Sequence, residues 1–178
     1  MSAARLHVPP EVHAALAQVR PPRPFDLDEY LARVSQARGH RLVLHEDDLP
    51  VDLCGLWRFD GRTDHIYVPR GAAGSHRWQI IAHEVGHMLM APEGVTFGHG
   101  IDETSREQMA PDATDWLQNM FPHMDNEVLA RYFARTGYDE ENELHAELYG
   151  TLAIAGVHAD ERAMKGRLGR IRQAMDGL

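Results

Sequence analysis

The stretch SHRWQIIAHEVGHMLM, residues 75–90, carries the strongest structural signal in this chain. Its apolar residues recur with a helical period, Ser75 is a good N-cap, and Pro92 and Gly94 follow its end. We therefore predict a helix from Ser75 to about Met90. At about 100° per residue this helix has two distinct sides. A core side would carry Trp78, Ile81, Ala82, Val85 and Leu89, and a histidine side would carry His76, Ile80, His83, His87 and Met90.

Within this helix, His83-Glu84-Val85-Gly86-His87 is an H-E-x-x-H motif. Residues four apart share a helix face, so both imidazoles can bind one metal ion. Neutral imidazole suits Zn²⁺, which lowers the pKa of a bound water to about 7. Glu84 could then take the water proton and deliver it to a leaving amine. We predict one zinc ion per chain on His83 and His87, with Glu84 as general base. Gly86 costs about 1 kcal/mol relative to Ala, which a close approach of another backbone would explain.

A catalytic zinc site needs a third protein ligand, which we expect on a helix from about Glu140 to Ala155. Glu143 and Glu147 are four residues apart and project the same way. Glu143 could bind the metal, and Glu147 could accept the N–H of a ligand histidine. The core face of this helix would then carry Leu144, Leu148, Leu152 and Ala155. Three other carboxylates stay open as third ligands: Glu93, Glu103 and Glu107.

Upstream of the motif, the sequence predicts one helix and several strands. Asp26 can cap a helix that runs to about Arg38 and ends at Gly39. Short apolar or alternating segments at 41–45, 54–59 and 65–68 read as strands, with Gly61 supplying a positive φ in a hairpin turn. We therefore expect an α+β fold, in which a small antiparallel sheet packs against the H-E-x-x-H helix and the C-terminal half is mostly helical.

Proline and helix signals suggest how the chain is organised. Residues 1–24 hold two proline pairs around a possible short helix and are predicted to form a Pro-rich N-terminal arm. Residues 25–178 are predicted to form a single domain. Within it we expect a helical insertion at 112–136 and a last helix from Asp160 to about Met175.

Composition restricts the function. The 178 residues carry a formal net charge of −9, which disfavours direct binding to nucleic acid and favours a protein or peptide partner. The single cysteine, Cys54, excludes an internal disulfide and is expected to be a small buried hydrophobe. No signal peptide or membrane-spanning run is visible, so we expect the cytoplasm and no membrane partner.

Two segments of the chain resemble the ImmA/IrrE-type metallopeptidases. The first runs from Gly55-Leu56-Trp57 through Ile66-Tyr67-Val68 to the helix residues 77–87, similar to a glycine-containing hairpin that leads into H-E-x-G-H. The second is Glu143-Leu144-His145-Ala146-Glu147-Leu148-Tyr149-Gly150, similar to the family's E-x-x-A-(N/D)-x-F-A. Here Glu, Tyr and Gly replace Asn/Asp, Phe and Ala. The resemblance spans roughly residues 41–156.

The resemblance implies a zincin-like, gluzincin-type site of His83, His87 and Glu143, with Glu84 as base and Glu147 behind the ligands. It also implies cleavage of a helix-turn-helix repressor or antitoxin-type protein in a phage, mobile-element or stress-response circuit. The spacing from His87 to Glu143 is longer than is usual in the family, and the expected insertion at 112–136 would account for it.

Other functions are compatible with the same residues. A non-catalytic zinc-containing regulator or toxin component of the same fold would bind a repressor without cleaving it. A zinc hydrolase of small substrates would need no protein partner. For a protein substrate, an edge strand near Ile66 and Tyr67 could bind an extended segment by strand addition. Tyr149 and His145 are better explained as structural residues than as oxyanion stabilisers.

Overall fold

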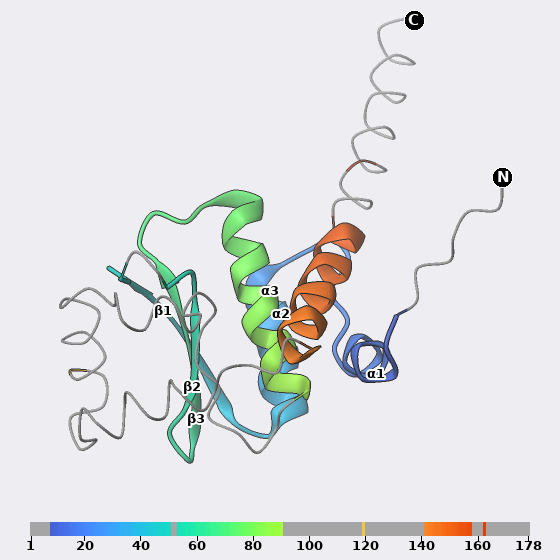
Figure 1. Cartoon of the computed structure of the whole chain (residues 1–178), viewed down its shortest axis with the longest axis horizontal. Helices are drawn as coiled ribbons and strands as arrows, with labels where there is room; N and C mark the ends of the chain where they lie inside the picture. Colours follow the sequence, from blue (N-terminus) through green and yellow to red (C-terminus); the bar gives the residue numbers. More distant parts are fainter. Residues whose placement is uncertain (1–7, 51–52, 91–118, 120–140, 158–161, 163–178) are drawn as a thin grey trace, which may run out of the picture.

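The protein is described here by a computed structural model that covers residues 8–50, 53–90, 119, 141–157 and 162. Residues 141–157 form a helix. In Figure 1, α3 lies between the sheet and helix 141–157, drawn in orange. The architecture is α+β, as predicted. In chain order, the other elements are α1 (Pro10–Gln18), α2 (Leu27–Arg38), β1 (Arg41–Asp47), β2 (Leu56–Phe59), β3 (Thr63–Pro69) and α3 (Gly74–Met90).

Local capping signals set the bounds of α2. The Asp26 side chain accepts a hydrogen bond of 2.8 Å from the Glu29 amide, which satisfies one of the free N–H groups at the helix start. Gly39 ends the helix with a left-handed φ of 71°. The predicted helix from Asp26 to Arg38 is confirmed.

The predicted hairpin of β2 and β3 is also present. β2 pairs antiparallel with β3, and Gly61 in the turn has a φ of 92°. The Asp60 carboxylate accepts hydrogen bonds from the amides of Arg62 and Thr63, at 2.9 and 2.8 Å. This Asx-type turn fixes the register of the two strands.

The expectation of a purely antiparallel sheet is wrong. The strand order is β1-β3-β2, and β1 pairs parallel with β3, from Arg41 beside Thr63 to Asp47 beside Pro69. Two reversals separate these strands, one after β1 and one at the hairpin, so β3 runs in the direction of β1. Turn signals report only on consecutive strands, and this pairing joins strands that are not consecutive.

The hydrophobic core draws on every described element. Val12 of α1 and Val19 just after it are almost fully buried in it, so the described part of the predicted N-terminal arm packs on the same core. Cys54, by contrast, is exposed, which contradicts the expectation of burial. The centre of the core includes Tyr30, Val34, Trp57, Ile66, Val68, Ile81, Val85, Met88 and Tyr149.

Several predictions fall on other parts of the chain. The insertion at 112–136 and the last helix lie outside the described residues, apart from positions 119 and 162. The alternative ligands Glu93, Glu103 and Glu107 lie outside them as well. Among the helices that the structure describes, none combines the length and apolarity needed to cross a bilayer.

Candidate metal centre

The H-E-x-x-H motif lies on α3, where His83 and His87 turn toward the same point. Their Nε2 atoms are 3.0 Å apart. The helix is not divided into a core side and an open histidine side, because Glu84 and His87 are 1% and 2% exposed. Both sides of α3 are covered, one by the sheet and the other by helix 141–157 (Figure 1). The histidines therefore lie at a helix–helix interface.

A buried polar network holds the end of α3. Asp64 of β3 is fully buried and accepts two hydrogen bonds from the Arg38 guanidinium, at 3.1 and 3.2 Å, and one of 2.8 Å from the Trp57 indole. Arg38 also donates to the Met88 carbonyl at 2.7 Å, where the helix dipole favours a cation. This network ties α2, the hairpin and the C-terminal end of α3 together. Sequence reasoning missed it, because Arg38 looked like an ordinary basic residue in the last turn of α2.

Two glycines let helix 141–157 approach α3 closely. A Cβ added at Gly86 would lie 3.1 Å from the Ala146 Cα, and one added at Gly150 would lie 3.2 Å from the His83 amide nitrogen. Both distances are shorter than ordinary van der Waals contact, so each glycine makes room for the other helix. The close approach predicted for Gly86 is confirmed, and it brings helix 141–157 beside the motif.

The close crossing places Glu143 at the histidine pair. Glu143 Oε1 is 3.3 Å from His87 Nε2, and Oε2 is 3.5 Å from His83 Nε2. The three residues offer ligand atoms that all lie within 4.8 Å of one another. A tetrahedral zinc site with bonds of 2.0–2.1 Å has ligand–ligand distances of about 3.3 Å. The two imidazole nitrogens are 3.0 Å apart, and each has one of the two Glu143 oxygens at 3.3 or 3.5 Å, so the donor set of two imidazoles and one carboxylate is close enough to share one zinc ion.

Glu84 faces the start of β2 as well as the motif. A Cβ added at Gly55 would lie 2.7 Å from Glu84 Oε1 and 2.7 Å from Ile80 Cγ2. Gly55 thus leaves the space that the Glu84 carboxylate occupies. Gly55, the first residue of the hairpin segment that resembles the family, is thus needed to leave room for the predicted general base.

The remaining candidates are on helix 141–157. Glu147 is exposed, and its role behind a ligand histidine stays a prediction. Tyr149 is fully buried, and its hydroxyl lies 3.0 Å from that of Tyr30. His145 is 9% exposed, with Nε2 4.0 Å from Glu141 Oε1.

The expected core face of this helix is half right, because Leu148 and Leu152 pack against the core but the other two residues do not. Leu144 is 61% exposed, and Ala155 is exposed too. The helix turns Ala146, Tyr149 and Gly150 toward α3, and the small Ala146 and Gly150 permit the close crossing. Its buried side carries Ala146, Tyr149, Gly150, Ala153, Ile154 and Val157.

Comparison with known protein families gives one match. The model of a peptidase family, M78, described as an IrrE N-terminal-like domain, matches residues 37–155. The matched span contains the whole sheet, α3 and most of helix 141–157. No curated protein and no solved structure matches the chain significantly.

Proposed function

Because the chain belongs to the peptidase M78 family of IrrE N-terminal-like domains, we propose that it is a zinc metalloendopeptidase with a gluzincin-type site. The observation that carries this proposal is the convergence of His83, His87 and Glu143 within 4.8 Å. These three side chains would hold the zinc ion. When bound, zinc supplies a Lewis acid that polarises a carbonyl and acidifies water.

Glu84 is the residue proposed to move the proton. It follows the proposed ligand His83 directly, and the residue is 1% exposed. As general base it takes a proton from the attacking water, and as general acid it returns that proton to the leaving amine nitrogen. Gly55 keeps its carboxylate position free of any competing side chain.

An extended substrate would pair with β2. The earlier suggestion that Ile66 and Tyr67 bind it is wrong, because β3 is the central strand and is paired on both sides. Among the strands that the structure describes, β2 is at the edge of the sheet, and Gly55, which leaves room for the Glu84 carboxylate, directly precedes it. A substrate strand added at β2 would therefore run beside the proposed base.

The proposed substrate is a helix-turn-helix repressor or antitoxin-type protein in a phage, mobile-element or stress circuit. Resemblance to the ImmA/IrrE-type peptidases supports this choice, and the net charge of −9 favours a protein over nucleic acid. The cytoplasm is the compartment in which such a substrate would be met.

The mechanism is tested with Glu84→Gln. We expect the zinc-loaded wild type to cleave a repressor encoded beside its gene, and the variant to keep zinc and fold but lose at least about 100-fold in cleavage rate. Gel electrophoresis and mass spectrometry of the repressor measure this. The matched control, Glu11→Gln at an exposed position of α1, should cleave normally. Undiminished cleavage by Glu84→Gln would rule out the assigned base. A stable complex with an intact repressor would favour the non-catalytic regulator.

The ligand set is tested by metal content. We expect about one zinc per chain in the wild type, as a single site of three protein ligands requires. His87→Ala and Glu143→Ala should both lose the ion. Glu147→Ala should keep it with affinity lowered about 10–100-fold, if it orients a ligand histidine. If zinc were lost from His87→Ala but kept by Glu143→Ala, the third ligand would be Glu93, Glu103 or Glu107 instead of Glu143. A wild type that takes up no zinc would contradict the proposal.

A further inference from the structure

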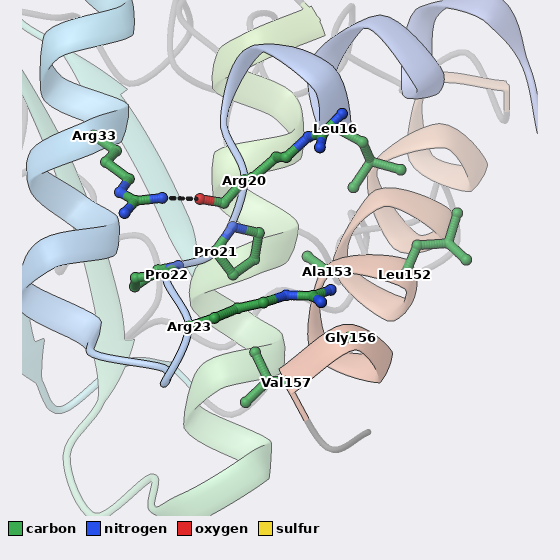
Figure 2. A pocket seen from close by; sticks show the side chains of 10 residues that line it. All are labelled: Leu16, Arg20, Pro21, Pro22, Arg23, Arg33, Leu152, Ala153, Gly156 and Val157. Atoms are coloured by element: carbon green, nitrogen blue, oxygen red, sulfur yellow. Dashed lines mark hydrogen bonds between the residues drawn. The ribbon is translucent and has the colours of Figure 1, made fainter. Parts of the chain in front are cut away.

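A groove of about 630 Å³ lies between the α1–α2 connection and helix 141–157 (Figure 2). Its helix side begins at Leu152, nine residues after the proposed ligand Glu143, which is about 14 Å along a helix axis. The groove is therefore separate from the metal centre, although one helix contributes to both.

The rim of the groove is cationic. Arg20, Arg23 and Arg33 line it, and none of the lining residues that the structure describes is acidic, in a chain whose net charge is −9. Arg33 is held in place by an ion pair with Glu29 and by a hydrogen bond of 3.1 Å to the Arg20 carbonyl. The Arg20 side chain is exposed and forms no ion pair with any residue that the structure describes. Arg20 thus offers an available positive charge at this rim.

The three guanidinium groups lie apart around the groove and do not converge on one point (Figure 2). This spacing suits several separated carboxylates better than one small anion. Arginine also pairs with carboxylates in a bidentate manner, which gives such contacts direction.

The wall of the groove is apolar and preorganised. Leu16, Leu152 and Val157 line it, together with Pro21 and Pro22. The prolines fix φ and offer no backbone N–H, so this stretch of the wall is restrained and does not compete for polar partners. A volume of about 630 Å³ is in the range of sites that bury a ligand, so the groove can take a few apolar side chains.

We propose that this groove docks an acidic amphipathic segment of the protein substrate, remote from the bond that is cut. Apolar side chains of the segment fill the space beside Leu152, and one of its carboxylates pairs with Arg20. That the docked segment belongs to the substrate rests on the proposed function. The preference of the groove for acidic amphipathic peptides does not depend on that function.

The test uses the full chain carrying Glu84→Gln, so that bound peptide stays intact. The probe is a fluorescein-labelled peptide that carries Leu at helical spacing and Glu at the positions between. The control peptide has Lys in place of every Glu. Fluorescence anisotropy should show binding of the Glu peptide that weakens as salt rises, and at least about fivefold weaker binding of the Lys peptide. Equal binding of both peptides would overturn the proposal.

Two variants locate the binding. Arg20→Glu should weaken binding of the Glu peptide at least about fivefold. Arg62→Glu makes the same charge change on the exposed hairpin turn and should alter this affinity less than about twofold. Gly156→Leu should also abolish binding by filling the groove. A Cβ there meets, among described atoms, only an Arg23 nitrogen at 3.9 Å, so the variant should fold. Equal effects of Arg20→Glu and Arg62→Glu would overturn the proposal.

The two proposals fail separately. Repressor cleavage without peptide binding would overturn the docking groove and leave the peptidase intact. Peptide binding that depends on Arg20 and Gly156, in a protein that neither holds zinc nor cleaves, would support the groove and overturn the peptidase.

Discussion

Tyr149 connects the helix that carries Glu143 to α2. Its hydroxyl lies 3.0 Å from that of Tyr30, in the core. Burial raises the pKa of Tyr149 to about 12, and burial together with the Tyr149 neighbour raises the pKa of Tyr30 well above its usual value. Both hydroxyls thus stay protonated in the folded protein at pH values where an unfolded chain ionises.

This tyrosine pair predicts a loss of stability in alkali. Since the unfolded chain releases these protons above about pH 10 and the folded chain holds them, the free energy of unfolding should fall as pH rises from about 10 to about 12. Tyr149→Phe should cost about 1 kcal/mol at pH 8, because the Tyr30 hydroxyl loses its partner, and should show a shallower fall above pH 10. Urea unfolding at pH 8 and pH 11 measures both. Parallel pH profiles for the two proteins would contradict the assignment.

At the scale of elements, the candidate metal centre depends on the crossing of α3 and helix 141–157. Gly86 and Gly150 allow contacts of 3.1 and 3.2 Å between a would-be Cβ and the other backbone. Each glycine destabilises its helix by about 1 kcal/mol relative to alanine, but the close crossing that the two glycines permit brings Glu143 beside the histidines.

Gly150→Ala should weaken zinc binding roughly tenfold, because the added methyl group pushes the helix away from the His83 backbone and moves Glu143. The matched control is Gly156→Ala on the same helix, where the added Cβ meets only ordinary contact. It should stabilise the fold by about 0.5–1 kcal/mol and leave zinc affinity unchanged. Competition with a chromophoric chelator measures zinc affinity, and urea unfolding measures stability. Equal zinc affinity in Gly150→Ala and wild type would show that the crossing does not position the ligand.

At the scale of the whole molecule, distant segments fix the centre jointly. The pairing of Arg38 with Asp64 holds the end of α3, α1 adds Val12 to the core, and Gly55 makes room for Glu84. The Arg38 side chain is 4% exposed and Asp64 is fully buried, so loss of either partner would break an ion pair in the interior, which is strongly destabilising. The helix that carries Glu143 also forms one wall of the arginine-rimmed groove.

The sequence alone determined what depends on near neighbours. Capping at Asp26 and Gly39, the turn at Gly61, the extent of α3 and the spacing of His83 and His87 all follow from contacts within a few residues, and Glu143 followed from a short motif. The tertiary structure alone decided the parallel pairing of β1 with β3, the exposure of Leu144 and Cys54, and the burial of Arg38 against Asp64. These depend on which surfaces meet, since an apolar side chain is buried only if a partner surface covers it, and a local pattern does not specify that partner.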